Sequence, residues 1–413
     1  MLLTDYKLLD LAQWQQLLSE SPVASWFQSP EAYAFFCSLP ELMQPFIVAV
    51  IRSESSPQAH PNLKQTLPQR SRSFPEGKET SPRLADRESV ALNNRSFEQK
   101  RDKNKETSQP LPQRSRSFPE GKETLRTLQT SQTSRTLQGL IVGYVTKEHN
   151  PLKQFFTRRA IIYGGPLLAD DITDEELAEL LMAVTGNPSS VTSNQSPVTI
   201  NPIFIETRNF NDYSRWRHVF EQCGFRYQPH YDMHILCSDR EQMQNAVAES
   251  KMRNIRKSLA DGIQVSEAAD ATDVHEFYLL LKQLYKSKVR TPLFEESFFQ
   301  SFVKDNRGVL LLVRQADNII GGMLCPMLEG RVLYEWYVVG PAVVTWAAMQ
   351  YAHSHALPIF DLMGAGEPGV PYGVRDFKLQ FGGKLLEYGR FLHITNRFLY
   401  GIGKLGVKIM RKY

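Results

Sequence analysis

The chain has few cysteines and no long apolar run. It contains four cysteines in 413 residues, and none of them forms a Cys-x-x-Cys pair or joins histidines at the spacing of a zinc site. We therefore expect reduced thiols, with no disulfide framework and no bound metal. No apolar run approaches the length of a bilayer span, and residues 1–18 lack the basic and apolar regions of a secretory signal. These absences predict a cytoplasmic protein.

Also absent are a Walker loop, an HExxH motif and a Ser/His/Asp order, so several classes of hydrolase and nucleotidase are not predicted. The net charge of +4 is also uninformative, because it comes from one segment. Residues 53–137 carry 16 Lys and Arg against 10 Asp and Glu, which leaves 32 against 34 elsewhere. The rest of the chain is near neutral, so its charge does not indicate a nucleic-acid partner.

Residues 53–137 read as an insertion. They are rich in Ser, Pro, Gln and charged residues, and they carry the sequence LPQRSRSFPEGKET twice, at 67–80 and at 111–124. Such a composition predicts disorder, because it buries too little apolar surface to offset the entropy of ordering. The β-prone segments on either side, 45–52 and 139–148, are expected to pair as the two arms of one hairpin.

The remaining chain repeats one order of elements. Residues 213–235 align with 372–394 without gaps and match at four positions, namely Tyr213 with Tyr372, Gly224 with Gly383, His234 with His393 and Ile235 with Ile394. We therefore predict an α/β (α+β) fold of two tandem units, each a mixed β-sheet with flanking helices. The predicted division is 1–52 plus 138–240 for the first unit, 53–137 for the disordered insertion, 241–394 for the second unit and 395–413 for a basic amphipathic helix.

Residues 357–394 are predicted to pass from a strand to a glycine loop, a short helix and a second strand within forty residues. A short apolar strand leads into a loop with three glycines, Gly364, Gly366 and Gly369, and then into a helix that Pro371 can open. On this helix Val374, Phe377 and Phe381 are predicted to form the buried stripe, with Arg375 and Lys378 on one flank. The alternative is an ordinary helix with a solvated cationic edge.

Three segments carry a family resemblance: YGGPLL at 163–168, RNIRKSLADG at 253–262 and YGVRDFKLQFGG at 372–383. With the order of elements, they resemble the Fem-type aminoacyltransferases of peptidoglycan bridges and the wider GNAT-like acyltransferases. The resemblance implies two GNAT-like units and transfer of an aminoacyl group from a charged tRNA to an amine of a cell-wall precursor. It also implies that Phe377 and Lys378 lie in the channel where donor meets acceptor. Tyr163, in the YGGPLL turn, is a further predicted substrate-binding residue.

Two departures leave the acyl donor open between aminoacyl-tRNA and acyl-CoA. The strand-to-helix junction that holds the pyrophosphate of acetyl-CoA in GNAT enzymes reads YVVGPAVVTW at 337–346, with a proline and a single glycine. The long paired-helix arm of some Fem enzymes has no counterpart between the halves. No cofactor is predicted.

Amide formation needs a neutral amine, a donor for the developing oxyanion and exclusion of water. Lys378 is the predicted donor, assisted by Arg375 or by N–H groups at Gly364 and Gly366, and Asp361 is the predicted base or amine-orienting group. The alternatives are an ion pair from Lys378 to Glu335 or Asp361, and a loop-capping role for Asp361. Further predicted substrate-binding residues are Glu335, Tyr337 and Tyr372.

Two basic segments have predicted partners. Arg253 and Arg256 lie three apart on one helical segment and could grip a phosphate of a nucleotide-linked or lipid-linked acceptor, although a solvated face is the alternative. In 396–413 an apolar stripe and a basic stripe predict docking on an anionic membrane at the inner face, unless the apolar stripe packs on its own domain. The apolar stripe consists of Phe398, Ile402, Leu405 and Ile409.

The predicted function is therefore an acyltransferase that forms an amide on a cell-envelope precursor. One alternative is an acyl-CoA-dependent N-acyltransferase acting on an amino sugar or lipid. The other is an inactive binding scaffold that kept the fold.

Overall fold

A long antiparallel hairpin forms the centre of the first sheet. A computed structural model describes residues 2–53, 135–186, 200–305 and 307–412. In it β2 (Met43–Ser53) pairs with β3 (Arg135–Thr146), and the last pair is Ser53 with Arg135. The predicted hairpin is thus confirmed, and it includes four residues assigned to the insertion from the sequence. The disorder predicted for the insertion, and both copies of the repeat, lie outside the described residues.

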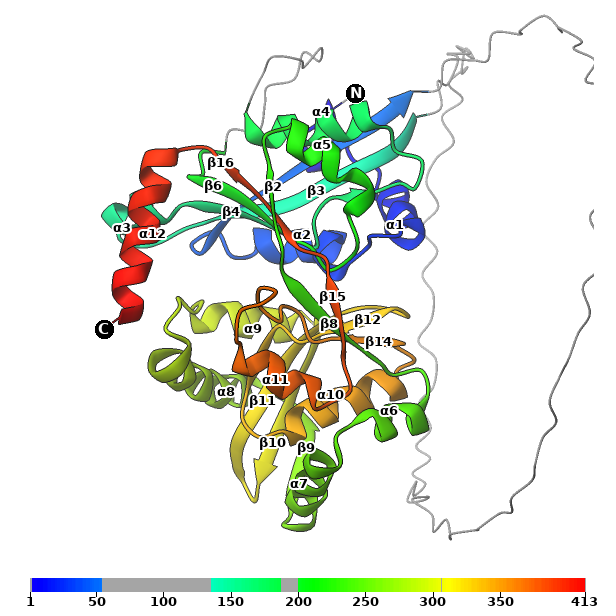
Figure 1. Cartoon of the computed structure of the whole chain (residues 1–413), viewed down its shortest axis with the longest axis vertical. Coiled ribbons are helices and arrows are strands. Elements are labelled where there is room, and N and C mark those ends of the chain that lie inside the picture. The colour runs from blue at the N-terminus through cyan, green and yellow to red at the C-terminus, as the bar shows by residue number, and fades with distance from the viewer. Residues whose placement is uncertain (1, 54–134, 187–199, 306, 413) are drawn as a thin grey trace, which may run out of the picture. The chain divides into compact units, whose positions relative to one another are not determined.

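The first sheet is mixed, because β4 and β6 are parallel whereas the other pairs are antiparallel. Helices α1 and α2 flank it together with α3, α4 and α5 (Figure 1). The strand order is β1 (Leu2–Leu3), β2, β3, β4 (Arg159–Tyr163), β6 (Phe204–Arg208), β16 (Arg390–Ile394) and β7 (Arg226–Gln228), with β5 (Leu167–Leu168) beside β3. The helices are α1 (Leu11–Glu20), α2 (Pro30–Cys37), α3 (Pro151–Thr157), α4 (Asp174–Thr185) and α5 (Arg217–Gln222).

The second sheet is also mixed and has the same plan. Its order is β15 (Lys384–Glu387), β8 (Tyr231–Leu236), β14 (Ile359–Asp361), β12 (Val332–Tyr334), β11 (Asn318–Leu328), β10 (Gly308–Gln315) and β9 (Ile263–Glu267), with β13 (Tyr337–Val339) beside β11. Its helices are α6 (Arg240–Ala246), α7 (Glu249–Ala260), α8 (Ala271–Leu284), α9 (Glu296–Lys304), α10 (Val343–Ser354) and α11 (Gly373–Leu379). Two eight-stranded mixed sheets with flanking helices confirm the predicted fold class.

The two halves exchange their last strands. β8 follows β7 in the chain but lies between β14 and β15, and β16 follows β15 but lies between β6 and β7. The aligned residues His234 and His393 occupy equivalent positions, opposite Asp361 in one sheet and Ile205 in the other. β7 and β8 are therefore two separate strands, one in each sheet. Pro229, which cannot donate a ladder hydrogen bond, lies where the chain leaves one sheet for the other.

Aromatic side chains join the two halves. Phe27, in the short helix η2 (Trp26–Gln28), has its ring centre 4.9 Å from Tyr163 in the first half. The same ring lies 5.5 Å from Tyr334 and 5.1 Å from Trp336 in the second half. Such ring pairs add to the burial of apolar area, so this cluster fixes the two sheets against each other.

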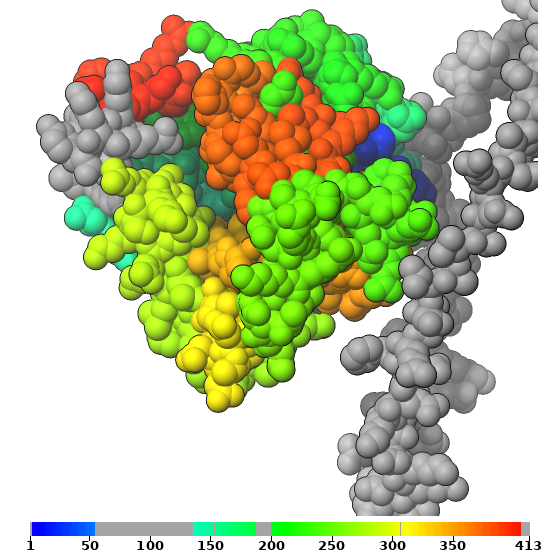
Figure 2. All heavy atoms as spheres, turned by 60° about the horizontal axis from the view of Figure 1, so that its bottom comes forward, coloured from blue at the N-terminus to red at the C-terminus, as the bar shows by residue number. Residues whose placement is uncertain are grey.

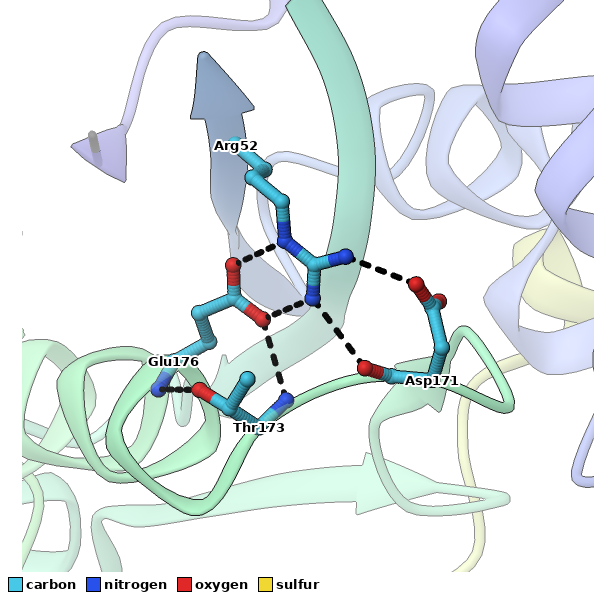
Figure 3. Close-up of polar contacts among 4 residues, drawn as sticks. All are labelled: Arg52, Asp171, Thr173 and Glu176. Carbon is cyan, nitrogen blue, oxygen red and sulfur yellow. Dashed lines mark hydrogen bonds and ion pairs between the residues drawn. The ribbon is translucent and has the colours of Figure 1, made fainter. Parts of the chain in front are cut away.

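An arginine clamps the end of β2 to the start of α4 (Figure 3). Arg52 donates two hydrogen bonds to the Glu176 carboxylate, at 2.8 and 2.7 Å. It also donates to the Asp171 carboxylate at 2.7 Å and to the Asp171 carbonyl at 3.1 Å. Glu176 also forms a capping box with Thr173. Burial raises the pKa of Glu176, but hydrogen bonds from Arg52 and Thr173 outweigh it and lower that pKa. The hairpin is therefore anchored next to the predicted insertion.

The C-terminal helix α12 (Arg397–Lys412) packs on the first half through one side. Leu399 is buried, and the Tyr400 ring lies 5.3 Å from Phe204 of β6. Phe398 and Leu405 are 76% and 60% exposed on another side. Among the described residues, no helix combines the length and apolarity needed to cross a bilayer.

Candidate active site

The second sheet splits where β12 and β14 end. These strands are parallel and paired from Val332 with Ile359 to Tyr334 with Asp361. The N–H of Glu335 donates to the Asp361 carbonyl at 2.8 Å, and beyond this bond the strands separate. After β12 the backbone continues into β13, which pairs with β11. After β14 the backbone enters the glycine loop at 362–370. The split opens a gap into which side chains of α11 reach.

Lys378 of α11 fills this gap. Its Nζ lies 3.0 Å from Glu335 Oε1 and donates to the carbonyls of Leu362 and, at 3.4 Å, Gly364. The side chains of Lys378 and Glu335 are only 8% and 7% exposed. Burial raises the pKa of Glu335, although the ammonium of Lys378 opposes the rise. The ion pair that the sequence left open as an alternative is therefore present.

The predicted buried stripe of this helix is wrong in two of its three positions. Phe381 is fully buried, but Val374 and Phe377 are 44% and 37% exposed. Phe377 instead packs on Phe381, with the ammonium of Lys251 4.4 Å from its ring centre. The physical reason is that the seven-residue helix lies over the gap. Lys378, which has the buried charge partner Glu335, therefore points inward in place of the apolar residues.

Several of the predicted site residues lie close together, and their side chains contact the glycine loop. Arg375 donates to the loop carbonyls of Glu367, at 3.0 Å, and of Val370. The Tyr372 ring packs so closely on Gly366 that a Cβ there would lie 2.8 Å from it. Gly366 also has a φ of 82°, which favours glycine. Arg375 and Tyr372 therefore hold the shape of the glycine loop.

Asp361 lies behind the loop. It is 1% exposed, and its Oδ1 accepts the N–H of Met363 at 2.6 Å. Met363 has a φ of 56°, which is uncommon for a residue with a side chain, so the carboxylate stabilises a strained turn. The loop-capping alternative for Asp361 is therefore observed in the structure.

Gly364 brings the loop to polar side chains of β6, of β16 and of the connection between β7 and β8. A Cβ on Gly364 would lie 3.2 Å from His230 Nε2 and 3.7 Å from Arg390 Nη2. Arg390 donates to His230 at 3.0 Å and to Glu206 at 2.9 Å. Glu206 also pairs with Arg208 at 3.3 Å. We call Glu206, Arg208, His230 and Arg390 the arginine cluster.

Tyr163 joins this cluster through Arg208, whose Nη1 donates to the phenol oxygen at 2.9 Å. Sequence reasoning predicted Tyr163 but missed the four residues of the arginine cluster. A signal was present, since Glu206 and Arg208 interrupt the apolar strand FIETR on the same face.

The arginine cluster is suited to an anion. Although burial opposes it, Arg208 and Arg390 lower the pKa of Glu206 to about 2. Burial and Arg390 lower the pKa of His230 to about 4, so the imidazole is neutral and accepts the hydrogen bond from Arg390. Two guanidinium groups thus face one carboxylate. Arg208 Nε, which is buried, has no hydrogen-bond partner within the described part of the chain. Planar donors of this kind suit phosphate or carboxylate groups.

The remaining predicted residues lie farther out. Tyr337 is half-buried against Phe299, with ring centres 5.0 Å apart. Arg253 and Arg256 lie on an exposed face of α7, where Arg253 pairs with Glu249 at 3.3 Å. Figure 2 shows the green segment that contains α7 beside the orange segment that contains α11, where Lys251 makes the contact described above.

Comparison with solved structures finds a similar fold in FemX. No family model and no curated protein sequence matches the chain. The crystal structure of FemX superposes with a TM-score of 0.55 at 12% identity, covering 95% of this chain and 98% of FemX. L-PGS from Bacillus licheniformis gives a TM-score of 0.43 at 12% identity, covering 66% of this chain and 86% of that one. A GCN5-related N-acetyltransferase from Kribbella flavida gives 0.32 at 11% identity, covering 61% and 85%. The chain therefore shares the fold of FemX over nearly its whole length.

Proposed function

We propose that this protein is an acyltransferase that forms an amide on a cell-envelope precursor, with Lys378 at the point where donor and acceptor meet. The observation that carries the proposal is a buried lysine in the strand split of a FemX-like fold, next to a glycine loop and a cluster of arginines. The proposed donor is an aminoacyl-tRNA, and an acyl-CoA is the alternative.

The chemistry requires few groups. The acceptor amine attacks the acyl carbonyl, a C–N bond forms, and the C–O bond to the tRNA ribose breaks, while the amine proton passes to the leaving oxygen. Two of the three ammonium hydrogens of Lys378 are held by Glu335 and Leu362. The third makes a long contact of 3.4 Å to the Gly364 carbonyl. A substrate carbonyl oxygen can replace this weak contact and accept the hydrogen bond as its negative charge develops.

The other predicted residues have supporting parts in the proposal. Phe377 and Tyr372 are 37% and 39% exposed beside the loop, and they are proposed to contact the donor together with Tyr337. Glu335 keeps the Lys378 ammonium in place, and Asp361 keeps the loop in shape.

The acceptor is proposed to bring an anionic group to the arginine cluster. The cluster lies within contact distance of Gly364, so an acceptor held there would present its amine near Lys378. Cell-envelope precursors carry phosphates and carboxylates, which match two guanidinium groups. Arg253 and Arg256, on the exposed face of α7, are proposed as a second contact for a diphosphate.

One observation favours aminoacyl-tRNA over acyl-CoA. At the β13–α10 junction Gly340 packs on Gly321. A Cβ on Gly340 would lie 2.5 Å from the Gly321 Cα. Close strand packing explains this glycine, and Pro341 next to it has no N–H to offer a pyrophosphate.

Contact with the inner face of an anionic membrane is also proposed, through α12. The described part of its apolar stripe faces outward rather than into the domain, with Phe398 76% and Leu405 60% exposed. Exposed apolar and basic side chains on one helix favour an interfacial position. This position would bring the enzyme to lipid-linked acceptors.

The melting temperature of the full chain tests the donor. We expect aminoacyl-tRNA to raise it more than deacylated tRNA does, because a ligand that binds the native state stabilises it. A rise with acyl-CoA but not with free CoA would support the alternative donor. If neither acyl donor acts beyond its matched control, the proposal is wrong.

A further inference from the structure

Three polar side chains converge behind the glycine loop, outside the gap that Lys378 fills. Asp232 and His234 are two apart on β8, so they point to the same face of the second sheet. Asp361 lies directly opposite His234 on β14. Their ligating atoms all lie within 4.8 Å of one another.

Each carboxylate is oriented by one oxygen and leaves the other without a partner. Asp361 Oδ1 accepts the Met363 N–H at 2.6 Å, and Asp232 Oδ1 accepts the Met233 N–H at 2.8 Å. Asp232 Oδ2, Asp361 Oδ2 and His234 Nε2 are buried and have no hydrogen-bond partner among the described residues. An outer contact that fixes a carboxylate while its other oxygen stays unpaired is typical of metal ligands.

Within the described part of the chain, no lysine or arginine forms an ion pair with either carboxylate. Asp232 and Asp361 are 3% and 1% exposed, so two carboxylates share one buried place. Lys378 is committed to Glu335, and Arg331 donates to the carbonyls of Leu18 in α1 and of Ser21. Either a proton or a cation must therefore be held between the carboxylates.

The geometry points to a divalent-cation site formed by Asp232, His234 and Asp361. Zinc ligand distances of about 2.0–2.2 Å place two tetrahedral ligands roughly 3.3–3.6 Å apart. His234 Nε2 and Asp361 Oδ2 are 3.4 Å apart. One imidazole with two carboxylates suits Zn²⁺, and also Co²⁺ or Mn²⁺, better than Ca²⁺, which takes oxygen ligands.

A cavity supplies the fourth position and a route of entry. It has a volume of about 150 Å³ and is lined by His234 and Asp361 together with Asn211 and Arg331. This volume holds several waters, so a bound cation could keep one of them as a ligand. The cation would tie β8, which comes from the first half of the chain, to β14 of the second half. We assign this cation a structural role, which is independent of the proposed acyl transfer.

Uptake of Co²⁺ and Zn²⁺ by the full chain tests the site. We expect one equivalent of Co²⁺ to be bound with the visible absorption bands of tetrahedral coordination, and Zn²⁺ to displace it. We also expect His234→Gln and Asp361→Asn to weaken binding by more than roughly 100-fold, since even outer contacts of a metal site contribute 10–100-fold. Because the absorption bands are read on the unmutated chain, a variant that fails to fold does not remove the test.

The matched control is the double variant His218→Gln/His275→Gln. It removes two exposed histidines that pair with Asp174 at 2.7 Å and Glu296 at 3.0 Å, while the buried site stays intact. Affinity close to that of the unmutated chain is expected. Absence of stoichiometric uptake would overturn the proposal and favour a proton shared between the carboxylates. Uptake that survives in His234→Gln and Asp361→Asn would place the metal elsewhere and overturn it equally.

Discussion

Lys378 Nζ and Glu335 Oε1 lie 3.0 Å apart at the point where β12 and β14 separate, and both side chains are more than nine-tenths buried. A buried pair of this kind adds little net stability, because desolvation offsets the attraction between the charges. Removing one partner is different, since the other charge is then left unpaired. The pair therefore couples the stability of the second sheet to the side chain proposed to act in acyl transfer.

Lys378→Met should destabilise the protein by about 3–5 kcal/mol, because it leaves Glu335 buried without its partner. The double variant Lys378→Met/Glu335→Gln should recover most of this loss, since no buried charge remains. Urea unfolding of the two variants and the unmutated chain measures both effects. Equal loss in the single and double variants would show that the ion pair does not set the stability.

Unfolding should become easier as the pH falls from about 6.5 to about 4, in part because of His230. The folded-state pKa of His230 is lowered to about 4 from its ordinary value of 6.5. In this interval the unfolded chain binds a proton that the folded chain does not, so the free energy of unfolding drops with pH. His230→Gln, which still offers Arg390 an acceptor, should flatten this part of the profile. An unchanged slope in the variant would contradict the assignment.

Residues 54–134 should be dispensable for folding. Ser53 and Arg135 are paired across the hairpin, so Asn-Gly between them gives the preferred two-residue turn. The shortened chain should be at least as stable, because each halving of a loop recovers about 0.6 kcal/mol of closure entropy. A comparison of urea unfolding measures this. A loss of stability in the shortened chain would show that the segment packs on the folded part.

Exposed residues of α12 should govern membrane binding. Phe398→Ser/Leu405→Ser should lower co-sedimentation with anionic vesicles and leave the melting temperature unchanged, because both side chains are largely exposed. Zwitterionic vesicles serve as the control for charge, with each basic residue contributing about 1 kcal/mol at an anionic surface. Equal binding of the variant and the unmutated chain to anionic vesicles would exclude docking through this face.

Much of the fold could be predicted from local pattern. The apolar runs at 45–52 and 139–148 gave the hairpin, and the alignment of 213–235 with 372–394 gave the duplication. The exchange of β8 and β16 could not be predicted, because a strand has the same apolar alternation in either sheet. Partner choice depends on how the two halves pack.

Only some residues of the candidate site were named from the sequence, and the arginine cluster was not among them. Lys378, Glu335 and Asp361 were named from the sequence, yet helical periodicity assigned the inward face to Val374 and Phe377. Periodicity counts apolar residues and does not include a buried counter-charge from another strand. The group of Asp232, His234 and Asp361 was missed because its third member is far away in sequence. Only the pairing of β8 with β14 brings it close.

Amide formation tests the central proposal most directly. The full chain is incubated with aminoacyl-tRNA or acyl-CoA and an amine-bearing envelope precursor, and the amide product is quantified by mass spectrometry. We expect product from the unmutated chain, and at least about 100-fold less from Lys378→Met/Glu335→Gln, which loses the oxyanion donor but leaves no unpaired buried charge. Normal turnover by this double variant would remove Lys378 from the chemistry. Absence of any amide from the unmutated chain with either donor would contradict the assignment of an acyltransferase.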